Sequence, residues 1–126
     1  MDMEPKYFVC EHCGELVELI KDAGEPLLCC GERMKEIVPA TTDAAVEKHV
    51  PVYQVENGVV KVRVGETAHP MLPEHWIEWV VLQTKQGIQR KMLKPGDKPE
   101  TCFALCEGDE VEKVYAFCNL HQLWKG

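Results

Sequence analysis

The chain has 126 residues and a formal net charge of −7 at pH 7, and 45% of its residues are hydrophobic. This length fits one ordinary domain, or one small domain followed by one of modest size. The acidic balance argues against nucleic acid as the main partner, because phosphate binding needs a basic surface. No apolar run is long enough to span a membrane, and Met1–Glu4 carries no signal-peptide pattern, so we expect a cytoplasmic protein without a membrane partner.

Residues 1–37 are rich in metal-ligating side chains and poor in core residues, so a bound metal would supply much of their stability. Tyr7–Val9 predicts a short strand that enters a Cys-x-x-Cys turn, and Leu16–Ile20 predicts a second strand. The two adjacent cysteines in Cys29–Gly31 require a sharp bend, because neighbouring residues in a strand point to opposite faces. The glycine makes such a bend inexpensive. We therefore expect a small metal domain over residues 1–37.

Residues 38–126 indicate a second domain made of antiparallel strands. Val38–Asp43 is typical of a linker, Ala44–His49 predicts about one helical turn, and Asn57-Gly58 is a strong hairpin signal. Short strands at this spacing favour an antiparallel sandwich. The predicted strands are Val52–Val55, Val59–Val64, Trp76–Thr84, Ile88–Leu93, Thr101–Cys106 and Val111–Cys118.

Seven cysteines in a cytoplasmic chain indicate metal or redox ligands rather than a disulfide framework. Four of them, Cys10, Cys13, Cys29 and Cys30, have the spacing of a tetrahedral site for zinc or a single iron. Spacing alone favours structural zinc, whereas the adjacent second pair departs from a zinc ribbon and favours iron once the second cluster is considered. We expect His12 to point outward between two ligands.

A second cluster combines four histidines with one cysteine: His49, His69, His75, Cys118 and His121. Each residue alone is weak evidence, but together they exceed what a tetrahedral structural site needs. Such a set of nitrogen and sulfur donors indicates a redox metal with one position left for substrate. A blue-copper site is the competing interpretation, but it would use two histidines and a weak axial methionine, and no methionine follows His121. Two further cysteines, Cys102 and Cys106, are left over, and we expect both to pack in the core.

These motifs carry a family resemblance that spans essentially the whole chain. The four-cysteine cluster resembles the desulforedoxin iron site. The second set resembles superoxide reductase, on the segments Glu47–Pro51, Ala68–Met71, His75–Ile77 and Cys118–His121. In this order they resemble desulfoferrodoxin, the two-iron form of superoxide reductase. The resemblance implies an immunoglobulin-like β-sandwich that carries the second of two iron ions, and a homodimer. It also implies reduction of superoxide to hydrogen peroxide with electrons from a rubredoxin-type donor.

The resemblance also implies residue roles at the second iron. His49, His69, His75 and His121 would be the equatorial ligands, and Cys118 the axial thiolate. Lys48 lies next to a ligand, so its ammonium could attract the anionic substrate and position a proton-donating water. The Glu47 carboxylate could bind ferric iron after product leaves. A rubredoxin-like electron carrier and a zinc-ribbon interaction module without catalysis stay open as alternatives.

Overall fold

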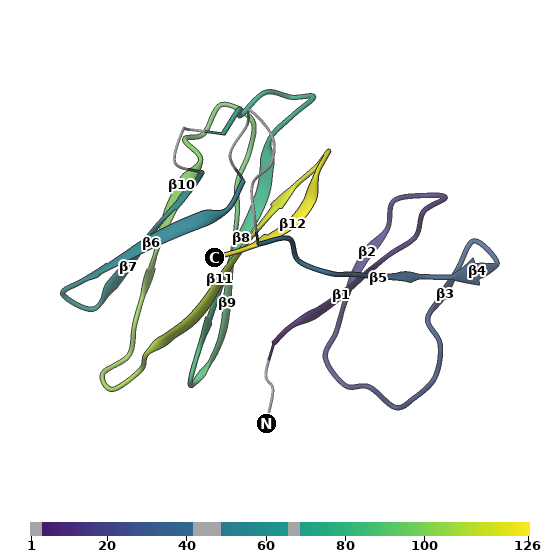
Figure 1. Cartoon of the computed structure of the whole chain (residues 1–126), viewed down its shortest axis with the longest axis horizontal. Coiled ribbons are helices and arrows are strands. Elements are labelled where there is room, and N and C mark those ends of the chain that lie inside the picture. The colour runs from purple at the N-terminus through teal and green to yellow at the C-terminus, as the bar shows by residue number, and fades with distance from the viewer. Residues whose placement is uncertain (1–3, 42–48, 66–68) are drawn as a thin grey trace. The chain divides into compact units, whose positions relative to one another are not determined.

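The computed structural model describes residues 4–41, 49–65 and 69–126. Contacts divide the chain into two compact units, Met1–Val38 and Pro39–Gly126, which are drawn in Figure 1. Every regular element in the described residues is a strand, as expected for a mainly β protein. A search of the same residues finds no helix with the length and apolar character that crossing a membrane requires.

The smaller unit consists of five short strands. Three form an antiparallel sheet in the order β2-β1-β5, and two form a separate hairpin. Tyr7 and Ile37, which pair across β1 and β5, supply its buried apolar side chains together with Cys10. The strands are β1 (Lys6–Val9), β2 (Leu16–Leu19), β3 (Leu28–Cys29), β4 (Glu32–Arg33) and β5 (Lys35–Ile37).

The sharp bend expected at the adjacent cysteines is confirmed. Cys29 pairs with Glu32, so Cys30 and Gly31 are the two central residues of a hairpin turn between β3 and β4. Both have left-handed backbone angles, with φ of 53° and 77°. A two-residue turn of this kind requires positive φ at both central positions, which is easy for glycine and costly for cysteine.

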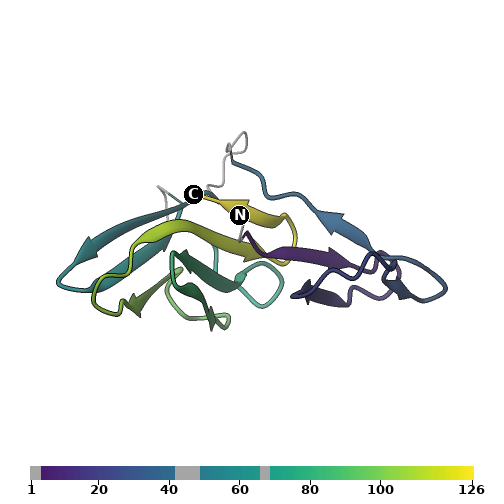
Figure 2. The same cartoon turned by 90° about the horizontal axis from the view of Figure 1, so that it is seen from below.

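The larger unit is a sandwich of two antiparallel sheets. One has the order β10-β7-β6, and the other the order β12-β11-β8-β9. In Figure 2 the long strand β11 runs between β12 and β8, in agreement with this order. The strands are β6 (Pro51–Glu56), β7 (Val59–Val64), β8 (Ile77–Thr84), β9 (Gly87–Met92), β10 (Glu100–Ala104), β11 (Val111–Cys118) and β12 (Gln122–Lys125).

The core lies between the two sheets. In β7, Val60, Val62 and Val64 are buried, whereas Lys61 and Arg63 between them are exposed, as their alternation predicts. Side chains from β8, β10 and β11 complete the same cluster, and Cys118 is part of it at the end of β11. The thiol of the second candidate centre is therefore anchored in the apolar core.

The structure differs from the sequence-based expectations in two respects. The last strand, β12, was not predicted, because Gln122–Lys125 is short and follows Cys118 after only a tight turn. Cys102 and Cys106 do not pack in the core: both are exposed. Cys102 alternates with the inward-facing Phe103 on β10 and so points outward. The helical turn expected over Ala44–His49 lies in residues 42–48 outside the described part, apart from its last residue, and stays a prediction.

The turn between β11 and β12 generates a stability prediction. Gln122 pairs with Cys118 and has a φ of 62°, a left-handed angle that costs a residue with a Cβ. Gln122→Gly removes that cost but adds entropy to the unfolded chain, so we expect a net gain of about 0.5–1 kcal/mol in the free energy of unfolding. Urea denaturation at matched iron content measures it. Gly58→Ala, at a φ of 75°, is the matched control and should lose about 1 kcal/mol. Equal stabilities for Gln122→Gly and the parent chain would contradict the assigned backbone angle.

Candidate metal centres

The four cysteines of the smaller unit converge on one point. Their sulfur atoms all lie within 4.8 Å of one another. The Sγ atoms of Cys13 and Cys29 are 3.6 Å apart, and those of Cys29 and Cys30 are 4.0 Å apart. Sulfurs bound tetrahedrally at about 2.3 Å from a metal lie roughly 3.8 Å from each other, so the sulfurs have the spacing of a tetrahedral centre.

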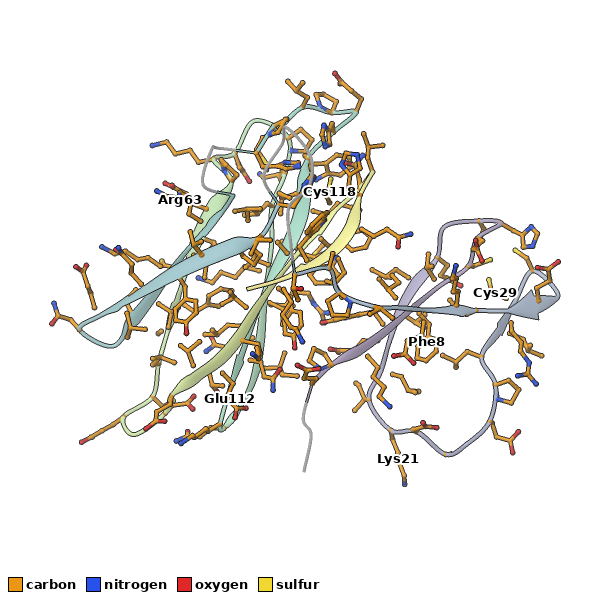
Figure 3. All side chains as sticks on the ribbon, in the orientation of Figure 1. Phe8, Lys21, Cys29, Arg63, Glu112 and Cys118 are labelled. Carbon is orange, nitrogen blue, oxygen red and sulfur yellow. The ribbon has the colours of Figure 1, made fainter. Side chains whose placement is uncertain are left out.

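Two local structures present these thiols. After β1 the chain turns, with the Gly14 amide donating to the Cys10 carbonyl at 2.8 Å and the Cys10 amide donating to the Glu15 carbonyl at 2.9 Å. This turn carries the first two thiols, and the left-handed hairpin turn between β3 and β4 carries the second two. Figure 3 labels Cys29 in that hairpin.

The thiol cluster favours a cation over four free charges. The backbone amide of Cys13 above all lowers the pKa of Cys10 to about 6. Hydrogen bonds from Cys29 and Cys30 toward the Cys10 sulfur in turn raise the pKa of both these thiols. The Cys10 thiolate thus forms more readily, while ionisation of Cys29 and Cys30 is disfavoured. A bound metal cation supplies the positive charge that lets all four ionise.

Two polar side chains border the thiol cluster. The Cys29 sulfur lies 3.6 Å from Oε2 of Glu15. His12 points away from the cluster, as expected, since its Nε2 lies 2.8 Å from Oε2 of Glu32 and both side chains are more than half exposed. His12 is not among the four residues whose ligand atoms meet.

In the larger unit, four imidazole rings form a closed square. Neighbouring ring centroids are 4.6 Å apart for His49 and His69, and 4.7 Å for His69 and His75. They are 5.2 Å apart for His75 and His121, and 4.8 Å for His121 and His49. The diagonal from His49 to His75 is longer, at 6.5 Å. The rings therefore surround a common centre rather than stacking in a row.

Cys118 joins three of these rings. Its sulfur and one ring nitrogen each of His49, His75 and His121 all lie within 4.8 Å of one another. Cys118 Sγ is 3.7 Å from Nδ1 of His121. Cys118 is fully buried, and Figure 3 labels it in the larger unit. His121 is exposed, which leaves the cluster open to solvent on that side.

His69 stands in the square but outside that group of four. Its Nδ1 donates to the carbonyl of Pro70 at 2.7 Å, so the lone pair of the neutral ring lies on Nε2, which is buried. A backbone carbonyl that fixes the tautomer in this way is typical of metal-ligating histidines.

Trp124 on β12 is a contributor that sequence reasoning missed. Its ring stacks on His49 at a centroid distance of 4.5 Å and an interplanar angle of 13°. Its Nε1 donates to the carbonyl of His121 at 3.1 Å, so one indole contacts two members of the square. Because the strand that carries this tryptophan was not predicted, nothing in the sequence placed it near the histidines.

The sequence also singled out four other residues. Glu47 and Lys48 fall outside the described residues. Cys102 lines a surface hollow of about 730 Å³ on the outer face of β6, β7 and β10, together with Lys61 and Arg63. Neither cluster contains Cys102 or Cys106. The candidate metal ligands therefore lie in the two clusters and not in the hollow.

The fold and the clusters together define a two-unit β protein with one thiolate metal centre and one histidine–cysteine metal centre. A family profile for the desulfoferrodoxin N-terminal domain matches residues 4–37, and a profile for desulfoferrodoxin matches residues 41–126. The desulfoferrodoxin of Nitratidesulfovibrio vulgaris is 44% identical over 99% of this chain and 98% of its own length. That of Syntrophotalea carbinolica is 45% identical over 93% of this chain and 91% of its own.

Solved structures give a consistent result. The superoxide reductase from Treponema pallidum superposes with a TM-score of 0.85 at 40% identity, covering 99% of both chains. The one-iron superoxide reductase from Giardia intestinalis has a TM-score of 0.55 at 30% identity and covers 64% of this chain and 95% of its own. The chain belongs to the desulfoferrodoxin family. Its two clusters fit two iron ions, one in each unit, since both donor sets suit iron.

The two centres should be separable. An iron ion bound by four thiolates is red. Cys13→Ser removes one of the four sulfurs, so we expect it to empty or disorder the thiolate centre and to bleach this colour. The larger unit has its own apolar core, so its unfolding temperature and its iron should persist. Visible spectra, iron content and thermal unfolding measure this. Cys106→Ser, an exposed thiol outside both clusters, is the matched control. Loss of both irons in Cys13→Ser would contradict independent centres.

Proposed function

We propose that this protein is a superoxide reductase that acts at the histidine–cysteine centre. The observation that carries the proposal is the square of four imidazoles beside one buried thiol. Membership of the desulfoferrodoxin family and the likeness to superoxide reductases support it. In this proposal residues 1–37 form the four-cysteine iron domain and residues 38–126 the superoxide reductase domain.

The square supports a ligand assignment. His49, His69, His75 and His121 would hold iron through imidazole nitrogens, and Cys118 would hold it through its thiolate. When bound there in the ferrous state, iron would supply one electron to each superoxide, which with two protons gives hydrogen peroxide without release of dioxygen. The chain's own contribution is to hold five donors in place and to keep one side open. The exposed position of His121 supports access from that side.

Lys48 and Glu47 would serve the substrate and the resting state. Lys48 is bonded directly to His49, so its ammonium can reach the mouth of the site and offset the repulsion of an acidic chain. There it would attract superoxide and position a proton-donating water. Glu47 would bind ferric iron after the peroxide leaves, and it would not assist the encounter.

Three further parts of the proposal do not rest on the geometry of the site. They are a rubredoxin-type protein as electron donor, a homodimeric assembly, and a cytoplasmic location. A rubredoxin-type donor fits the chemistry, because each turnover consumes one electron and the site must be reduced again before the next superoxide binds.

The stoichiometry of products tests the proposal. A reductase forms one hydrogen peroxide for each superoxide consumed, whereas dismutation forms one for every two and releases dioxygen. We expect the parent protein to show the first ratio with a chemical or rubredoxin-type reductant. We expect Cys118→Ser to lose the thiolate-to-iron charge-transfer band and nearly all the activity, because it removes the one soft ligand of this centre.

Cys102→Ser is the matched control for that variant, since it changes an exposed thiol outside both clusters and should behave as the parent chain. Substantial activity in Cys118→Ser would show that the thiolate is a bystander. A zinc-filled protein without visible colour would instead favour a non-catalytic zinc-ribbon module.

Lys48→Ile should slow the reaction with superoxide by roughly ten-fold and remove or reverse its salt dependence, because net repulsion then remains. Pulse radiolysis across ionic strength measures both quantities. Lys61→Ile is the matched control: Lys61 is exposed and already lies 3.1 Å from Glu56, so its removal should change the rate little. An unchanged rate and salt dependence in Lys48→Ile would show that Lys48 is an ordinary solvated lysine with no part in attracting superoxide.

A further inference from the structure

We infer that the side chain of Asn119 is a positioning residue that fixes two ligand-bearing segments of the histidine–cysteine centre against each other. The inference rests on the proposed function, in which that centre binds iron. It concerns a side chain that touches none of the reacting atoms and acts through the ligands on either side of it.

Asn119 makes three hydrogen bonds to one short segment. Its Oδ1 accepts from the backbone amide of Trp76 at 2.8 Å, and its Nδ2 donates to the carbonyl of Glu74 at 3.0 Å. Its own backbone amide donates to the carbonyl of Trp76 at 3.2 Å. The side chain thus grips the backbone on both sides of His75.

The grip joins ligands that are far apart in sequence. Asn119 directly follows Cys118 and stands two residues before His121. His75 is itself closed into a loop, since its backbone exchanges two hydrogen bonds with Leu72, at 2.9 and 3.0 Å. One amide side chain therefore couples the thiol and one imidazole to another imidazole from a loop about 45 residues earlier in the chain.

The strand ladder alone does not set this geometry. The pairing of β11 with β8 shifts register between Phe117 and Cys118, which is where the centre begins. Ladder bonds position side chains well only where they are regular. At this irregularity the three hydrogen bonds of Asn119 hold the end of β11 against the segment before β8.

The chemistry of the contact requires an amide. Asparagine offers an acceptor and a donor on one planar group, and both are used here. Aspartate has nearly the same shape but, when ionised, can only accept, so its second oxygen would face the carbonyl of Glu74. Alanine would lose both side-chain contacts. The two substitutions therefore separate loss of shape from loss of the donor.

The experiment compares Asn119→Asp and Asn119→Ala with the parent holoprotein. Groups that orient metal ligands typically change metal affinity by about 10–100-fold when replaced. We expect a chelator to remove iron from the histidine–cysteine centre roughly ten-fold faster or more in both variants. We also expect the thiolate-to-iron charge-transfer band to shift, because the position of the Cys118 sulfur relative to the imidazoles of the centre is no longer fixed.

Tyr115→Phe is the matched control. Its hydroxyl donates to Oε1 of Gln83 at 3.0 Å, so it also loses a hydrogen bond in the larger unit, at a place outside the cluster. It should lower the unfolding temperature while leaving the band and the iron release unchanged. The red spectrum of the four-cysteine centre should stay constant in every variant.

Two results would overturn the inference. In one, both Asn119 variants keep the band and the iron-release rate of the parent protein. In the other, Tyr115→Phe changes band and release as much as they do, so that the effect is one of general stability. Failure of the proposed function looks different, because the parent protein itself would then lack the charge-transfer band and the peroxide yield.

Discussion

The larger unit depends on one constraint: donors from separate stretches of chain, between His49 and His121, must meet at one point. The strands lower the entropic cost of bringing these donors together. Cys118 ends β11 inside the core, and the pairing of β11 with β8 and β12 places the segments that carry His75 and His121 beside it. The indole of Trp124 then adds His49 by stacking. The apolar core thus does the ordering in advance, and the metal need not gather its ligands from a flexible chain.

The smaller unit solves the opposite problem. It has few buried apolar side chains, and its thiols come from two turns rather than from the ends of long strands. The left-handed backbone angle at Cys30 costs conformational energy, and no backbone interaction described above compensates for it. It is explained if the adjacent thiols are held to one ion, because the metal bonds then outweigh the strain. One chain therefore combines a centre that a fold positions with a centre that helps to hold a fold together.

The sequence was sufficient where a short pattern determines the outcome. Alternation in Val59–Val64, the Asn57-Gly58 turn and the spacing of the cysteines and histidines each rest on local geometry, and the strands and the clusters follow from them. It failed where the outcome depends on distant partners. Cys102 faces outward because neighbouring residues of a strand point to opposite faces and Phe103 takes the inner face of β10. The hydrophobicity of the thiol does not decide which face it takes. The roles of Trp124 and Asn119 need the pairing of β11 with β12 and β8, which no local pattern contains.

The two ligand sets also give the centres opposite charges, and this bears on which of them can receive an anion. Four thiolates around a divalent ion leave an excess of two negative charges, whereas four neutral imidazoles and one thiolate leave one positive charge. In an acidic chain the far field repels superoxide, and several cations of the described strands are engaged elsewhere: Lys61 with Glu56, Arg90 over the Trp79 ring and Lys91 with the Cys102 carbonyl. Attraction must then arise at short range. In the proposed centre neutral imidazoles would serve that purpose as well as binding, since they would hold the metal without cancelling its charge.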